Sequence, residues 1–188
     1  MRICVYCSSS GRIAESYVQT ARRLGEELAL RGHELVYGGG DVGLMGIVAR
    51  AVHTRGGRVT GIIPEALTRH DIIYRQANEL VITETMAERK GLMLERAEAF
   101  IALPGGFGTL EELSEALTLK QLGYLDRALV LLNADGFYDR LSAFFEQLIA
   151  LEFVRPDHRA LYHLADDVAG ALDYIESYAG CDLTTKWF

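Results

Sequence analysis

Short runs of apolar and β-branched residues alternate along the chain with longer segments in which apolar residues recur every three or four positions. The short runs predict strands and the longer segments predict amphipathic helices. The predicted strands span 2–7, 33–37, 58–63, 79–82, 99–103 and 128–132, with a short seventh at 161–164. The predicted helices span 14–31, 43–55, 86–98, 109–122, 138–151 and 167–178. This alternation predicts βαβ units around a parallel sheet.

The segment 14–31 illustrates the helical pattern. Ala21, Leu24 and Leu28 recur at steps of three and four, charged residues lie between them, and Gly32 follows. Such a helix packs its apolar side on a sheet. We therefore expect an α/β fold with a doubly wound, Rossmann-like parallel sheet and helices on both faces. Ligands of such sheets bind at the carboxyl ends of the strands.

The length of 188 residues suits one domain, and no linker-like run of serine, glycine or charge divides the chain. We assign residues 1–180 to a single domain and 181–188 to a C-terminal tail. The apolar runs are strand-sized and the start lacks the apolar core of a signal peptide, so we expect a cytoplasmic protein without a membrane partner.

The net charge of −7 argues against a nucleic-acid partner, because phosphate backbones require a basic surface. A small anion stays compatible with it. Cys4 and Cys7 have CxxC spacing, but no second Cys or His pair accompanies them, so we expect reduced thiols and keep a zinc or redox role as the alternative. No metal is expected. The remaining metal-capable side chains include five histidines, expected to be packing or surface residues: His33, His53, His70, His158 and His163.

Three glycine- or serine-rich segments follow predicted strands, at 8–11, 38–43 and 104–109. Glycine permits positive φ and close approach of the main chain, so such turns can direct N–H groups at a phosphate. The spacing Gly38-x-Gly40-x-x-Gly43 matches a dinucleotide-binding pattern, but it follows the second strand and no convincing ribose-binding acid ends the next one. A tight turn that packs the sheet or holds part of a smaller ligand is favoured over a dinucleotide site. A P-loop is excluded because no Gly-Lys-Ser/Thr occurs.

Charged residues accompany the third loop. Thr109 and Glu112 have the spacing of a helix capping box, which is one interpretation of this pair. The other places Glu111 and Glu112 beside a ligand's sugar. Arg89 and Lys90 begin the preceding helix, where cations oppose the helix dipole, and a bound anion would compensate them.

The motifs Met86-x-x-Arg89-Lys90 and Pro104-Gly-Gly-Phe-Gly-Thr-Leu-Glu-Glu112 together resemble the LOG (Lonely Guy) family of cytokinin riboside 5′-monophosphate phosphoribohydrolases. The family signature PGGxGTxxE is matched at each fixed position. The segments 7–10, 37–46 and 121–123 resemble further family motifs. Ala87 and Ser8 depart from the family pattern, which puts the substrate preference in question.

The resemblance implies hydrolysis of the N-glycosidic bond of a purine nucleoside 5′-monophosphate, without a cofactor. Arg89 and Glu112 match the catalytic residues. The implied substrate contacts are Gly105, Gly106, Phe107, Gly108 and Thr109 of the phosphate loop, together with Ser9, Gly39, Asp71, Lys90, Glu111 and Thr118.

The resemblance also implies a homodimer. The helices at 86–98 and 109–122 spread apolar residues beyond the stripe that one sheet face needs, which agrees with a partner surface. Two other functions stay open. A lysine decarboxylase would need a Schiff-base lysine, and the chain has three lysines, Lys90, Lys120 and Lys186. A non-catalytic carrier of a nucleotide or of the molybdenum cofactor would share the fold.

Overall fold

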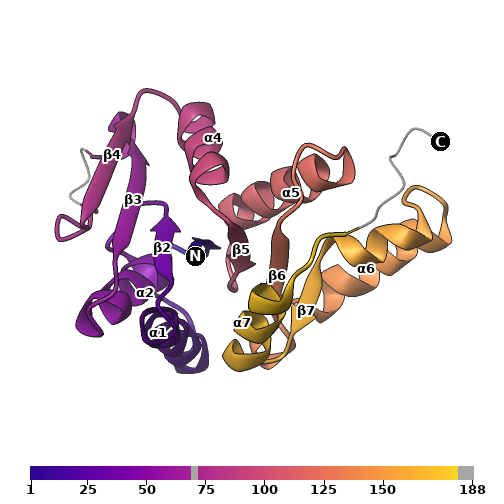
Figure 1. Cartoon of the computed structure of the whole chain (residues 1–188), viewed down its shortest axis with the longest axis horizontal. Helices are drawn as coiled ribbons and strands as arrows, with labels where there is room; N and C mark the ends of the chain where they lie inside the picture. The colour runs from indigo at the N-terminus through magenta and orange to yellow at the C-terminus, as the bar shows by residue number, and fades with distance from the viewer. Residues whose placement is uncertain (69–71, 182–188) are drawn as a thin grey trace.

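A computed structural model describes residues 1–68 and 72–181 of the chain. Seven parallel strands form one sheet in the order β4-β3-β2-β1-β5-β6-β7 (Figure 1). The strands are β1 (Arg2–Tyr6), β2 (Glu34–Tyr37), β3 (Val59–Pro64), β4 (Glu79–Thr83), β5 (Ala99–Ala102), β6 (Ala128–Leu132) and β7 (His163–Ala165). The Rossmann-like α/β class predicted from the sequence is confirmed.

Helices cover both faces of the sheet (Figure 1). The helices are α1 (Glu15–Leu30), α2 (Gly43–Thr54), α3 (Glu65–Thr68), α4 (Met86–Arg96), α5 (Phe107–Gln121), α6 (Asp139–Ala150) and α7 (Val168–Ser177), with 3₁₀ turns η1 (Ala134–Gly136) and η2 (Pro156–Leu161). Helices α1, α2 and α7 pack on one face, and α4 and α5 pack on the other. Successive side chains of a buried strand point to opposite faces of the sheet, so one strand contributes to both cores.

Strand β1 shows how one short sequence serves two cores. Ile3 and Val5 point to the side of α1 and α2, whereas Cys4 and Tyr6 point to the side of α4 and α5. All four side chains are buried. A strand buried on both faces carries a continuous apolar run, as the sequence does here.

The sheet reverses its winding at β1 and β5. Strands β2, β3 and β4 extend from β1 in one direction, and β5, β6 and β7 extend in the other. The loops after β1 and β5 therefore diverge around a crevice at their carboxyl ends, which is the usual ligand position in such sheets. The Ser8 N–H donates to the Pro104 carbonyl at 3.2 Å, which fixes the two loops together.

Most predicted elements are confirmed, with two corrections of position. The seventh strand is His163–Ala165 rather than 161–164, because residues up to Leu161 form η2. Helix α5 begins at Phe107 rather than at Thr109. No helix within the described part of the chain is both long and apolar enough to cross a bilayer.

Candidate active site

A cavity of about 480 Å³ lies at the carboxyl ends of the central strands. This volume is in the range of small-molecule sites. The loops after β1, β2 and β3 and the first turns of α4 and α5 form its walls. Eight of the residues predicted from the sequence line it: Ser9, Arg89, Gly106, Phe107, Gly108, Thr109, Glu111 and Glu112.

A buried ion pair lies at the centre of this wall. The Arg89 Nη1 donates to Glu112 Oε1 at 2.8 Å, and both residues are only 8% exposed. The Arg89 Nε donates to the Ile62 carbonyl at 3.1 Å. These two contacts fix the plane of the guanidinium group. The charge of Arg89 is therefore compensated by a carboxylate of the protein itself. The sequence analysis expects a bound anion in this role.

The pair is buried because each residue lies on the inner side of its helix. In α4 the buried residues are Arg89 and Met93, one turn apart. In α5 the buried residues include Thr109, Glu112 and Ala116, at steps of three and four. Both helices pack on the same face of the sheet, so the two inner sides converge. Burying charged side chains at these positions costs desolvation energy that hydrophobic side chains would not cost. Buried charged groups of this kind are typical of functional sites.

Burial raises the pKa of Glu112, and the Arg89 guanidinium beside it opposes that rise. Desolvation is the larger effect, so the pKa lies above the ordinary range of a glutamate. Such a carboxylate is poorly solvated and is held in one orientation by its partner. It can stabilise a positive charge that develops beside it in a transition state.

The first turn of α5 faces the same cavity. Its N-cap is Gly106, which makes no side-chain capping bond, and Thr109 is buried inside the helix. The capping-box interpretation of Thr109 and Glu112 is therefore wrong. The glycines of this loop predict non-helical backbone, but the helix starts among them. An N-terminus without a side-chain cap leaves first-turn N–H groups for an anion.

Two glycines allow close packing around these groups. A Cβ at Gly38 would lie 2.2 Å from the Arg89 Nη2, and a Cβ at Gly105 would lie 2.0 Å from the Thr109 Oγ1. Neither glycine has a positive φ, so the missing side chain matters rather than the backbone conformation. Gly38 leaves room for the guanidinium, and Gly105 leaves room for the Thr109 hydroxyl.

Four predicted site residues do not line the cavity. Lys90 forms ion pairs with Glu111, which lines the cavity, and with Glu115 at 3.2 Å, so it links α4 to α5. Gly39 and Gly105 are absent from the lining, although neighbouring glycines belong to it.

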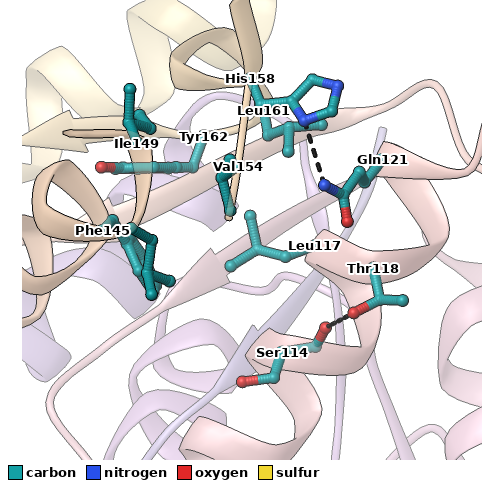
Figure 2. Close-up of a pocket in the computed structure, with 11 residues that line it drawn as sticks. Ser114, Leu117, Thr118, Gln121, Phe145, Ile149, Val154, His158, Leu161 and Tyr162 are labelled. Atoms are coloured by element: carbon teal, nitrogen blue, oxygen red, sulfur yellow. Dashed lines mark hydrogen bonds between the residues drawn. The ribbon is translucent and has the colours of Figure 1, made fainter. Parts of the chain in front are cut away.

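The fourth, Thr118, lines a separate cavity of about 210 Å³ between α5 and α6, where its hydroxyl donates to the Ser114 carbonyl at 2.8 Å (Figure 2). That cavity is mostly apolar, and Gln121 and His158 are hydrogen-bonded at its edge. Asp71 lies outside the described residues.

The sequence analysis missed an apolar wall of the main cavity. Its residues are Met45, Ile63, Leu67, Ile72 and Met86. Met86 and Met45 belong to motifs that were recognised, so their position could have been inferred. Leu67 and Ile72 lie between β3 and β4, where the sequence has no periodic pattern, and no signal marks them. Apolar residues together with charged ones in one cavity suit a ligand with an aromatic ring and an anionic group.

The cysteines and histidines give no indication of a metal. Burial is the main cause that raises the pKa values of the Cys4 and Cys7 thiols, which disfavours the thiolate needed for metal or redox chemistry. Within residues 1–68 and 72–181, no three His, Cys, Asp or Glu side chains are grouped to hold a metal ion. His33 and His158 are buried, in hydrogen bonds with Glu176 and Gln121 respectively.

The fold and this cavity define a Rossmann-like protein with a ligand site at its winding reversal. Comparison with known proteins identifies the family. A family model described as "Possible lysine decarboxylase" matches residues 45–175. A probable cytokinin riboside 5′-monophosphate phosphoribohydrolase of Oryza sativa subsp. japonica is 44% identical over 177 residues, which cover 94% of this chain and 78% of the rice protein. A cytokinin riboside 5′-monophosphate phosphoribohydrolase of Arabidopsis thaliana is 43% identical over 180 residues, which cover 96% of this chain and 84% of that protein. The chain belongs to the LOG family.

Solved structures share the fold. The molybdenum cofactor carrier protein of Chlamydomonas reinhardtii superposes with a TM-score of 0.74 at 26% identity, covering 94% of this chain and 96% of that one. The molybdenum cofactor binding protein of Rippkaea orientalis gives a TM-score of 0.73 at 22% identity, covering 94% and 95%. The second likeness concerns the fold alone.

Proposed function

We propose that this protein hydrolyses the N-glycosidic bond of a purine nucleoside 5′-monophosphate, releasing the free base and ribose 5-phosphate. The observation that carries the proposal is the buried Arg89–Glu112 pair beside the N-terminus of α5. The names of the rice and Arabidopsis relatives support the same reaction.

The N-terminus of α5 is the proposed phosphate site. The N–H groups of Phe107, Gly108 and Thr109 precede the first intrahelical bond, in which the Leu110 N–H donates to the Gly106 carbonyl. They point along the helix axis towards the cavity, and the helix dipole adds positive potential there. A phosphate bound here would serve as a remote handle that places the ribose beside Glu112.

Cleavage of a ribose–purine bond develops positive charge on the sugar and negative charge on the leaving base. The Glu112 carboxylate stabilises the oxocarbenium-like sugar and orients the attacking water. Arg89 holds Glu112 in place, and its remaining N–H groups bind the ribose or stabilise negative charge. Lys90 holds Glu111 at the edge of the site through their ion pair, while Ser9 and Gly39 belong to the loops after β1 and β2 that help to form it.

The apolar wall is the proposed base site. Its methionines and branched side chains would contact the flat face of a purine, and an N6 substituent such as a prenyl group would extend along them. We propose adenosine 5′-monophosphate and its N6-prenylated form as substrates. Plain adenosine lacks the phosphate handle and should react poorly.

The decisive experiment incubates the protein with a panel of nucleoside 5′-monophosphates and quantifies free base and ribose 5-phosphate. Release of both products in equal amounts supports the proposal. A folded protein that binds nucleotide but releases neither product would favour the carrier function. Equal rates for adenosine and its monophosphate would contradict the role of the phosphate handle.

Lysine decarboxylation is less well supported. Neither Lys90 nor Lys120 lines the cavity, and Lys186 lies outside the described residues. Ion pairing with Glu111 and Glu115 raises the pKa of Lys90, whereas a Schiff-base lysine must lose its proton readily. Absence of a pyridoxal absorption band after addition of the cofactor would dispose of this alternative.

We also propose a homodimer formed through α4 and α5. Exposed or half-buried apolar side chains on these two helices include Met86, Leu92, Leu94 and Phe107. Phe107 is 92% exposed, and exposed apolar surface of this kind often marks an interface. We further propose a cytoplasmic location without nucleic-acid partners, since the Cys4 and Cys7 thiols form no disulfide and the net charge is −7.

A further inference from the structure

The position of the apolar wall depends on a short non-local pairing. The Asp41 N–H donates to the Ile72 carbonyl at 2.6 Å, and the Tyr74 N–H donates to the Gly39 carbonyl at 3.0 Å. Gly40 and Ile73 form an antiparallel bridge between them. This pairing lays Ile72 against the second glycine loop, where its side chain lines the cavity. Whatever holds Tyr74 therefore helps to hold Ile72, one residue of the wall.

Tyr74 is held by a histidine. The Tyr74 side chain is almost fully buried, and its hydroxyl lies 2.8 Å from the Nδ1 of His53 in the last turn of α2. The two rings are also in contact, with centroids 5.4 Å apart. The His53 Nε2 lies 2.9 Å from the Asn78 Oδ1. A hydrogen-bonded chain thus runs from the wall segment to α2 and on to the start of β4.

Further contacts complete this network. The Val59 N–H donates to the Asn78 Oδ1 at 2.8 Å, so that atom is the amide oxygen and not the nitrogen, and His53 donates to it through Nε2. The Tyr74 hydroxyl also donates to the Gln76 Oε1 at 3.4 Å. Replacing the Tyr74 hydroxyl removes its hydrogen bond with His53 and with it the link between the wall segment and α2.

None of Tyr74, His53 and Asn78 lines the cavity. We propose that Tyr74 and His53 are positioning residues that hold Ile72 against the base of the bound nucleotide. The inference rests on the proposed function. The phosphate site on α5 and the Arg89–Glu112 pair have their own contacts, so the network sets affinity for the base and leaves phosphate binding and bond cleavage intact.

The test compares a ligand that carries the base with one that lacks it. In a Glu112→Gln background, which prevents turnover, Kd values for adenosine 5′-monophosphate and for ribose 5-phosphate are measured by calorimetry with and without Tyr74→Phe. We expect about a fivefold rise in the Kd of the nucleotide, the scale of one lost hydrogen bond, and a change below about twofold for ribose 5-phosphate. Equal changes for both ligands, or an unchanged nucleotide Kd, would overturn the proposal.

A matched control removes a tyrosine hydroxyl elsewhere. Tyr174 stacks on His163 with centroids 4.1 Å apart, and neither residue lines this cavity. Tyr174→Phe should change neither Kd. Melting temperatures of the two variants verify that both are folded.

Kinetics supply a second readout in the otherwise unaltered enzyme. Tyr74→Phe and His53→Gln should each raise KM several-fold with kcat within about twofold, and the double variant should be no worse than the more affected single variant because both break one network. Parallel losses of kcat would assign a merely structural role and refute positioning.

If the unaltered enzyme cleaves no nucleotide, the proposed function fails, while the comparison of the two Kd values still decides the positioning role. Failure of the reference protein to bind either ligand would overturn both.

Discussion

At the scale of single residues, Glu112 carries the proposed chemistry. Glu112→Gln removes its charge and preserves its volume and an acceptor for Arg89, so the fold should persist. We expect kcat to fall at least roughly 100-fold, the scale of losing one preorganised charge-stabilising group. Steady-state release of free base measures the effect. Glu115→Gln is the matched control, because Glu115 lies on the same helix and pairs with Lys90 outside the cavity. Near-normal turnover by folded Glu112→Gln would remove Glu112 from the mechanism.

The raised pKa of Glu112 predicts a pH dependence. If the carboxylate is the active form, kcat/KM should fall on the acid side with a midpoint above the ordinary glutamate value of about 4.3. The effect on stability has the opposite direction. A group whose pKa is higher in the folded state stabilises the fold below its unfolded pKa, and that contribution is lost as pH rises through the folded pKa.

Two measurements across pH 4 to 8, a range that brackets these values, examine this prediction. The acid limb of kcat/KM should shift upwards from the ordinary glutamate value. Urea unfolding of Glu112→Gln should show a smaller loss of stability with rising pH than the unaltered protein. An acid limb at or below the ordinary value would show that Arg89 outweighs burial.

Gly38 permits a test of the Arg89 position alone. In Gly38→Ala the new methyl group would displace the guanidinium end of a flexible side chain, so the fold should lose little stability. A displacement of about 1 Å near the reacting groups can cost on the order of 100-fold in kcat/KM, and we expect a loss of this size. Gly170→Ala in α7 is the control, since its Cβ would make only an ordinary 3.5 Å contact with Asp167. Full activity of Gly38→Ala would show that the guanidinium position is not critical.

At the scale of elements, α4 and α5 begin in different ways. The Thr85 hydroxyl oxygen accepts a hydrogen bond from the Glu88 N–H at 3.1 Å, which caps α4, whereas the N-cap of α5 is Gly106 and makes no side-chain capping bond. Thr85→Ala should lower the free energy of unfolding by about 1 kcal/mol, measured by urea denaturation. Thr20→Ala, in the middle of α1, removes a hydroxyl that bonds back to the Ser16 carbonyl and should be neutral or slightly stabilising. Equal effects of the two changes would contradict the capping role.

The helices and strands also show how much of the secondary structure could be predicted from the sequence. Strands such as β6 are predicted because each is a short apolar run, and α1 because its periodicity is regular. The start of α5 was misplaced because Gly106 and Gly108 indicate a loop by propensity, although the fold admits Gly106 as an N-cap and Gly108 as a helical residue. Local propensity does not reveal a helix that begins at a glycine because of its tertiary contacts.

At the scale of the whole molecule, Arg89 and Glu112 could each be selected because both belong to motifs of the family, but the ion pair between them was not predicted. The apolar wall was not predicted either. Ile72 reaches the cavity through a bridge between Gly40 and Ile73, far apart in the sequence, and no periodic signal encodes such a pairing. The contacts around Tyr74 likewise depend on three separate elements brought together by the fold.

The final prediction concerns assembly. Phe107 is exposed at the start of α5, and Leu92 and Leu94 are half-buried on α4. Exposed apolar surface of this kind often marks an interface. A two-fold interface places the same surface on both subunits, so one change alters the contact twice. Leu92→Glu should therefore dissociate the dimer. Light scattering at low micromolar concentration should give twice the 20.8 kDa chain mass for the unaltered protein and a smaller mass for the variant.

Leu30→Glu, on the exposed end of α1 at the opposite face, is the control and should leave the mass unchanged. Thermal denaturation must show that Leu92→Glu remains folded. A fully active species with the mass of one chain would refute the dimer.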